Sequence, residues 1–198
     1  TAVGLYRMAA RAWPEAGEAQ FNLGRALRLQ GRAAEGVEAL GRAIELDPRN
    51  AAAHWQLGKA LQELGVQTEA IGHFRQALAV APQLAGVHHD LAVSLWAGDA
   101  TSEAIVELRE AVRLAPRWPE AGSRLALLLA VTAAGQPAAV EEAITIARHS
   151  AELTDWHDPL ALEALAGTYA AAGRFDDAVS AQSRALDAAL QTKDERLA

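Results

Sequence analysis

The chain has 198 residues, no cysteine, a formal net charge of -7 and an apolar content of 51%. The acidic balance argues against nucleic-acid binding, which requires a clustered basic surface. The lack of cysteine excludes disulfides, thiolate catalysis and thiol-ligated zinc. The longest apolar run, Leu125 to Ala134, is shorter than the roughly 20 residues that span a bilayer, so we expect no membrane insertion.

A repeat organises the chain. Four prolines stand 34 residues apart, at Pro14, Pro48, Pro82 and Pro116. Small residues recur in the same phase, five positions before each proline, at Ala9, Ala43, Ala77 and Ala111. A period of this length, with small residues where helices cross and a proline closing each unit, is typical of stacked helix-turn-helix repeats.

The predicted elements follow this period from the first residue. Residues 1–16 have the phase of the second helix of a truncated repeat, so we expect the chain to be a piece of a longer polypeptide. Three regular repeats follow, at 17–50, 51–84 and 85–118. In the first of them the leading helix should end at Gly31, because glycine readily adopts the left-handed conformation that follows a helix.

The residues of the first regular repeat resemble a known family. Phe21–Leu27, then Gly31, Ala39–Leu40 and Ala43–Pro48, closely match the consensus of the tetratricopeptide repeat, with a departure at Gly36. The resemblance implies an all-α fold in which antiparallel helix pairs form a right-handed superhelical solenoid. It also implies one solenoid domain over residues 1–198.

The last part of the chain departs from the period and then returns to it. Residues 119–158 read as a repeat with an insertion, because the helix breaker Gly135–Pro137 lies in its middle. We expect its second helix over Ala138–Leu153. Residues 159–190 form the last repeat, and residues 191–198 form a polar tail or the start of a capping helix.

The resemblance implies that the first helix of each repeat lines a concave groove that binds a protein or peptide. Transferring the phase of each repeat gives the following groove residues: Phe21, Asn22, Arg25, Arg28, Trp55, Gln56, Lys59, Gln62, His89, Asp90, Trp96 and Arg124. Aromatic and arginine side chains carry much of the energy at protein interfaces. The alternative is a mixed surface without a ligand.

The cations among these residues suggest an acidic peptide as partner, because guanidinium and ammonium groups pair with carboxylates. One subtype of the family grips the free carboxylate of a chain terminus with lysines and asparagines. Only Asn22 fits that pattern, and Asp90 replaces a required basic residue. We therefore do not expect such a clamp.

His88, His89 and Asp90 suggest zinc ligands, but adjacent helical residues point about 100° apart and do not share one ion easily. His54 and His88 hold the same phase, which favours a packing role. No Ser-His-Asp arrangement or phosphate-binding glycine loop occurs. We predict no catalytic residue, no metal and no cofactor.

The sequence thus predicts a non-catalytic scaffold for protein–protein interaction. Two alternatives stay open. The repeats could regulate or position an attached enzyme domain, for example a glycosyltransferase, or they could mediate self-association through exposed terminal helices. Light scattering and the residues upstream of Thr1 distinguish these alternatives.

Overall fold

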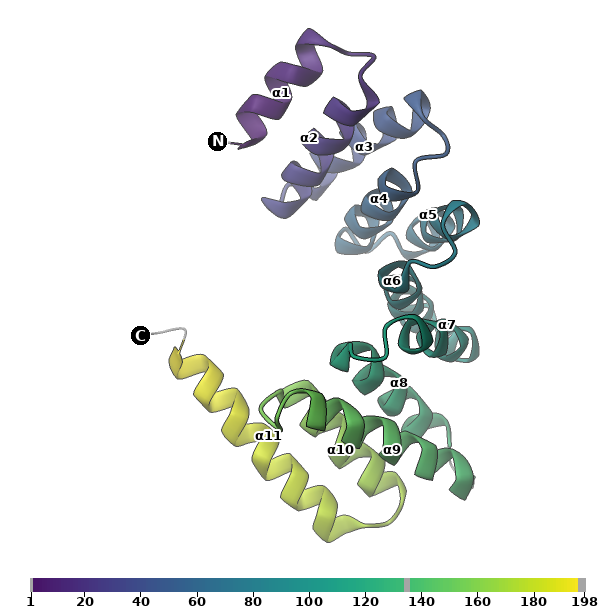
Figure 1. The fold of residues 1–198 in the computed structure, drawn as a ribbon, viewed down its shortest axis with the longest axis vertical. Coiled ribbons are helices and arrows are strands. Elements are labelled where there is room, and N and C mark those ends of the chain that lie inside the picture. The colour runs from purple at the N-terminus through teal and green to yellow at the C-terminus, as the bar shows by residue number, and fades with distance from the viewer. Residues whose placement is uncertain (1, 134–135, 196–198) are drawn as a thin grey trace. The chain divides into compact units, whose positions relative to one another are not determined.

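The computed structural model describes residues 2–133 and 136–195, with side chains up to residue 191. Within those ranges the chain forms eleven α-helices and no strand, which confirms the all-α helical repeat class. The chain divides into two compact units, Thr1–Ala104 and Ile105–Ala198. Figure 1 shows the helices in chain order.

Six helices belong to the first unit: α1 (Ala2–Ala12), α2 (Gly17–Leu29), α3 (Ala33–Leu46), α4 (Ala51–Glu63), α5 (Gln67–Val80) and α6 (Ala85–Ala97). The boundary between the units falls within α7 (Thr101–Leu114). The second unit continues with α8 (Pro119–Thr132), α9 (Pro137–Leu153), α10 (Pro159–Ala171) and α11 (Phe175–Glu195). None of the helices in the described residues combines the length and the apolar character needed to cross a membrane.

Small residues let the two helices of a repeat approach closely. A Cβ atom on Gly24 of α2 would lie 2.6 Å from Cγ of Leu40 on α3. In the next repeat, a Cβ atom on Gly58 of α4 would lie 2.6 Å from Cε1 of Phe74 on α5, and Phe74 is completely buried. The recurring glycines are therefore packing positions, where any side chain would push the paired helix away.

The turns between paired helices depend on the left-handed backbone conformation. Gly31 and Gly65 have φ angles of 74° and 77°, as expected for glycine after a helix. The third repeat has Asp99 at the equivalent position, with a φ of 61°. Aspartate tolerates this region better than most residues, but at a cost that glycine does not incur.

The second unit contains the irregular repeat. Its α9 begins at Pro137, one residue before the expected start, and ends at the expected Leu153. Gly135, the first residue of the predicted breaker, lies outside the described residues. The last helix, α11, continues to Glu195 without a break, so residues 191–195 extend this helix instead of starting a new one.

Candidate functional site on the first helices of the repeats

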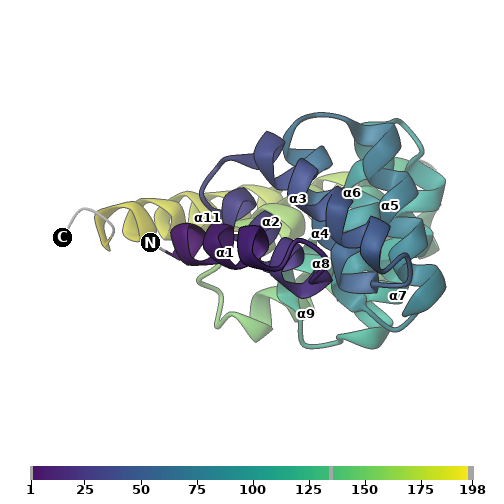
Figure 2. The ribbon, with the colours of Figure 1, turned by 90° about the horizontal axis from the view of Figure 1, so that it is seen from above.

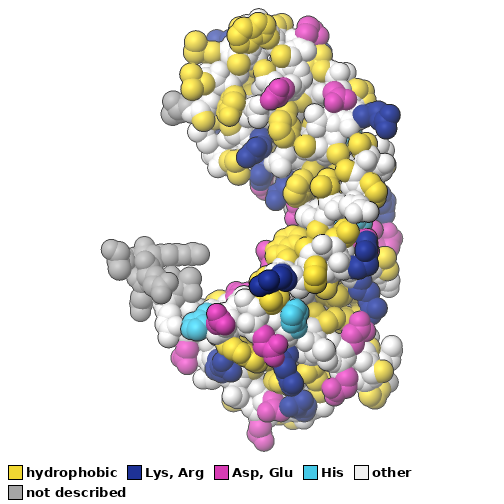
Figure 3. Space-filling view, in the orientation of Figure 1, with side chains coloured by type: hydrophobic (Ala, Val, Ile, Leu, Met, Phe, Trp, Pro, Cys, Tyr) yellow, Lys and Arg dark blue, Asp and Glu magenta, His cyan; other side chains and the backbone are white. Residues whose placement is uncertain are grey.

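The candidate site lies on α2, α4 and α6, the first helices of three successive repeats. Contacts of α2 with α4 and of α4 with α6 place these helices beside one another. We call the side of these helices that carries the predicted residues the first-helix face. Its members are Phe21, Asn22, Arg25, Arg28, Trp55, Gln56, Lys59, Gln62, His89, Asp90 and Trp96. In Figure 3, Lys and Arg side chains group near the end of α2.

The carboxylate of Asp90 is the centre of a polar network on this face. The indole Nε1 of Trp55 donates a hydrogen bond to Oδ2 of Asp90 over 2.8 Å, and Nζ of Lys59 lies 3.4 Å from the same oxygen. Nδ1 of His89 lies 3.1 Å from Oδ1. Two successive repeats are thereby joined through one partly buried carboxylate.

This environment keeps Asp90 ionised. Burial by itself would raise the pKa of Asp90, because desolvation disfavours the charged form. The hydrogen bonds from His89 and Trp55, together with the charge of Lys59, outweigh that effect and lower the pKa below its usual value. Asp90 is thus an internal counter-ion that fixes its neighbours.

Trp55 is held in one orientation by its contact with Gly86 as well as by its hydrogen bond to Asp90. Its six-membered ring lies over Gly86, where a Cβ atom would come within 2.6 Å of Cζ2 of the indole. The ammonium group of Lys59 lies 5.8 Å from the centroid of the Trp55 ring, at the outer range of a cation–π contact. The indole therefore forms a fixed, half-buried platform on the first-helix face.

Arg28 makes a second link between α2 and α4. Its Nε donates to Oε1 of Gln56 over 3.2 Å, and its Nη1 forms an ion pair with Glu63. The side chain of Arg28 is only 10% exposed. Much of the hydrogen-bonding capacity of this arginine is therefore used within the protein.

The third link connects α4 to α6. The amide nitrogen of Gln62 donates to Oγ of Ser94 over 3.0 Å and to the backbone oxygen of Asp90 over 3.3 Å. Ser94 is completely buried. This bond therefore satisfies a hydroxyl group that has no access to water.

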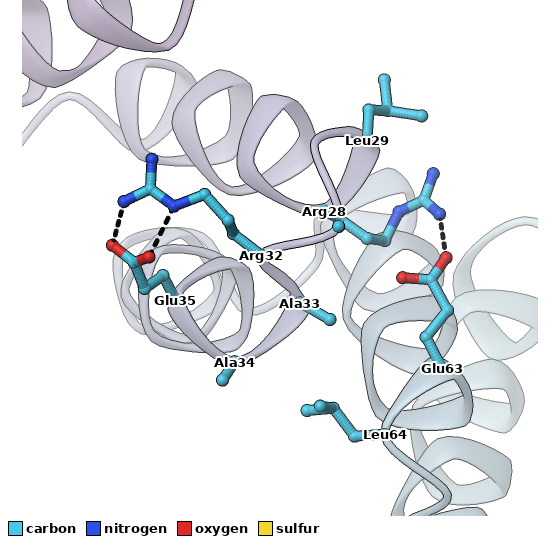
Figure 4. A pocket seen from close by; sticks show the side chains of 9 residues that line it. Arg28, Leu29, Arg32, Ala33, Ala34, Glu35, Glu63 and Leu64 are labelled. Atoms are coloured by element: carbon cyan, nitrogen blue, oxygen red, sulfur yellow. Dashed lines mark hydrogen bonds and ion pairs between the residues drawn. The ribbon is translucent and has the colours of Figure 1, made fainter.

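A cleft of about 670 Å³ lies beside the turn between α2 and α3. Figure 4 shows that Arg28 and Glu63 face each other at one side of it, whereas Arg32 and Glu35 form a bidentate pair at the other. In each ion pair the charge of the arginine is balanced by that of the glutamate. The sequence does not reveal this cleft, because the cleft forms only where the end of α4 approaches the turn between α2 and α3.

The remaining predicted residues occupy different environments. Arg25 and Trp96 are exposed, Phe21 and Asn22 are half-buried, and His89 is buried with 6% of its surface exposed. Arg124 lies on α8 in the second unit, where it pairs with Glu120 over 3.1 Å. The structure thus brings the residues of α2, α4 and α6 together in the first unit, and Arg124 belongs to a separate one.

His54 and His88 are both buried, and each bonds through Nε2 to the carbonyl oxygen of the proline six residues earlier. His54 also has its Nδ1 atom 3.1 Å from Nδ1 of His73 on α5. These contacts are those of packed histidines at the seam between repeats. Among the described residues, no three His, Asp or Glu side chains are arranged to hold a metal ion.

Comparison with known proteins finds a match to two repeat families in the first third of the chain. The family described as "Tetratricopeptide repeat" matches residues 1–39, and the one described as "TPR repeat" matches residues 24–65. No curated protein sequence matches the chain.

Solved structures share the fold at low sequence identity. YrrB, described as a TPR protein with an unusual peptide-binding site, is 21% identical; the match covers 96% of this chain and 97% of YrrB, with a TM-score of 0.76. MamA from Desulfovibrio magneticus RS-1 is 17% identical, with coverages of 88% and 96% and a TM-score of 0.75. A thermophilic TPR protein from Thermus thermophilus, TTC0263, is 23% identical, with coverages of 92% and 96% and a TM-score of 0.64. The 34-residue period, the paired helices and these matches identify tetratricopeptide repeats in the first third of the chain, and the solved structures show that the whole fold is of the tetratricopeptide repeat type.

Proposed function

We propose that the chain is a non-catalytic scaffold that binds an extended peptide segment of a protein partner on the first-helix face. The observation that carries the proposal is the fixation of Trp55 by Asp90 and Gly86. A large aromatic ring that is half-buried and already oriented loses little conformational entropy when a partner covers it. The peptide-binding site for which YrrB is described gives a precedent on the same fold.

The charges on the first-helix face favour an acidic segment. Arg25, Arg28 and Lys59 supply three positive charges; Asp90 on the face and Glu63, which pairs with Arg28 beside it, supply two negative charges, which leaves a formal charge of +1 (3 - 2). The whole chain has a charge of -7. A local excess of positive charge on an acidic protein steers acidic segments toward this face and away from the rest of the surface.

The test uses peptides selected on the intact chain from a random displayed library, with affinities measured by fluorescence anisotropy. We expect the Trp55→Ala variant to weaken the selected peptides at least about tenfold, as for an interface anchor. Trp13→Ala is the matched control, because Trp13 is 66% exposed and lies outside the first-helix face. Equal affinities for the wild-type chain and the Trp55→Ala variant would contradict the proposal.

Self-association is a second candidate, with a second copy of this chain as the partner. The terminal helices expose apolar side chains: Leu5 and Met8 on α1 are 70% and 69% exposed, and Phe175 and Val179 on α11 are 68% and 70% exposed. The charged residues of α1 are both arginines, whereas the first turn of α11 carries two aspartates. Light scattering over a hundredfold concentration range tests this candidate, which predicts a rising average mass that falls again with added salt.

The third possibility is that the repeats regulate or position an enzyme domain that is attached to them. It is compatible with a peptide-binding face, because a scaffold can present a partner to an enzyme. Sequencing the coding region upstream of Thr1 decides it.

A further inference from the structure

A pocket between α1 and α2 contains hydrogen-bond donors that no other residue in the described ranges uses. The pocket has a volume of about 200 Å³ and is lined by Ala2, Tyr6, Asn22, Arg25, Ala26 and Leu29. The two helices lie side by side in both ribbon views (Figures 1 and 2). We propose that this pocket binds the carboxylate of an acidic side chain in the partner peptide, which rests on the proposed function of the first-helix face.

The hydrogen-bond donors in the pocket are available to a ligand. In the part of the chain that the structure describes, the hydroxyl of Tyr6, the amide of Asn22 and the guanidinium of Arg25 form no hydrogen bond or ion pair with another residue. The other cations of the first-helix face differ, since Arg28 is paired with Glu63 and Lys59 with Asp90. The capacity of this face to accept an anion is therefore concentrated at Arg25.

The chemistry of the lining matches a carboxylate on a short aliphatic stem. A guanidinium group binds a carboxylate with two parallel hydrogen bonds, and the hydroxyl and amide groups offer further donors to the same oxygens. Ala2, Ala26 and Leu29 provide apolar surface for the methylene groups of the side chain. None of the described residues that line the pocket is acidic, so an incoming anion meets no repulsion from them.

The number of charges favours a carboxylate over a phosphate. Arg25 is the one cation among the described lining residues, and it balances a side chain with one negative charge. A phosphorylated side chain carries nearly two negative charges, and its recognition normally uses a cluster of arginines. The pocket also differs from a clamp for a chain terminus, because Tyr6 comes from the helix that precedes the first helix of the repeat.

The test is an NMR titration of the intact chain with N-acetyl-glutamate methylamide, and with the glutamine analogue as the neutral probe. We expect saturable shifts of the Arg25 Nε–H and the Asn22 side-chain amide signals with the glutamate probe and none with the glutamine probe. Arg25→Gln should weaken the binding of the glutamate probe at least about tenfold, because a charge-assisted bidentate contact is lost. Tyr6→Phe should weaken it by a smaller factor of about three, the loss of one hydrogen bond.

Arg42→Gln is the matched control, since Arg42 is an exposed arginine on α3 that pairs with Glu15 and Glu45. Equal shifts with both probes, shifts centred on Lys59 instead of Arg25, or an equal loss in the Arg42→Gln variant would overturn the pocket assignment. The scaffold proposal is judged separately. A peptide that depends on Trp55 but binds the Arg25→Gln variant normally would contradict the pocket assignment and leave the first-helix face intact.

Discussion

The indole nitrogen of Trp55 and the carboxylate of Asp90 are joined by a hydrogen bond of 2.8 Å that links α4 to α6. The two residues are 35 positions apart, one more than the repeat period, so they are not equivalent positions of successive repeats. The bond fixes the aromatic ring of the proposed binding face, and it stabilises the stacking of one repeat on the next. Stability and recognition therefore depend on the same pair.

Replacing Asp90 by alanine should lower the free energy of unfolding of the first unit by about 2 kcal/mol, because three donors lose a charged acceptor in a partly buried site. The indole N–H signal of Trp55 should also move toward the position of a free indole. Urea denaturation and two-dimensional NMR measure the two effects. Asp187→Ala on α11 is the control, and it should change neither quantity, since Asp187 is exposed and distant in sequence.

Gly86→Ala tests the close contact between Gly86 and the Trp55 ring. A Cβ atom there would lie 2.6 Å from Cζ2 of the indole, so the ring must move, and we expect a loss of about 1 to 2 kcal/mol from overpacking. The same substitution at Gly72, whose added Cβ atom meets nothing within 4 Å, should raise stability by up to about 1 kcal/mol. A stabilised Gly86→Ala variant with unchanged Trp55 signals would show that the ring does not rest on this glycine.

Asp99→Gly should stabilise the protein by about 0.5 to 1 kcal/mol. Asp99 adopts a φ of 61° at the turn where the two preceding repeats have Gly31 and Gly65, and glycine adopts this conformation without a steric cost. Asp177→Gly, in the first turn of α11, should have the opposite effect, because it removes a carboxylate that pairs with Arg174 over 2.7 Å and stabilises the N-terminus of the helix. Thermal unfolding of the two variants and the wild type measures both changes in stability. A destabilised Asp99→Gly variant would contradict the claim that the backbone is strained at Asp99.

The His54–His73 contact makes stability depend on pH. Burial lowers the pKa of His73, and the nearby charge of His54 lowers it further, whereas Glu69 opposes the shift. In the unfolded chain, His73 binds a proton near its ordinary pKa of about 6.5, whereas in the folded chain its pKa is lower. The contribution of His73 to folding stability is therefore complete above that pH and is lost as the pH falls below it.

We therefore expect His73→Gln to reduce the loss of stability between pH 7.5 and pH 5. Urea denaturation at the two pH values gives this difference, and His149→Gln on the exposed surface of α9 is the control. A wild-type chain that loses no more stability over this range than the His73→Gln variant would show that His73 does not take up a proton on unfolding.

The periodic pattern predicted the helices well, because it reports which residues face a neighbouring helix. The end of α9 at Leu153 coincides with its prediction, and its start differs by one residue. At the end of the chain the pattern left a polar tail and a capping helix open as alternatives, and residues 191–195 continue α11. Polar residues after the last repeat are compatible with either a break or a longer helix, since no neighbouring repeat constrains them.

The candidate site was less predictable from the sequence. Phase alone assigns Arg25, Arg28 and Lys59 to one face, but it does not distinguish cations with internal partners from those without. The structure pairs Arg28 with Glu63 and Lys59 with Asp90, and it buries His89. Tyr6 was missed because it lies on the helix before the first complete repeat.

The sequence by itself determined the repeat length, the helical class and the positions of the glycines at helix crossings. These follow from local rules: the period of apolar residues, the stop at proline and the lack of a side chain on glycine. Only the tertiary structure decided which polar side chains bond one another across successive repeats. Such contacts depend on side-chain directions and on distances of a few ångström between helices far apart in the chain, which no local pattern encodes.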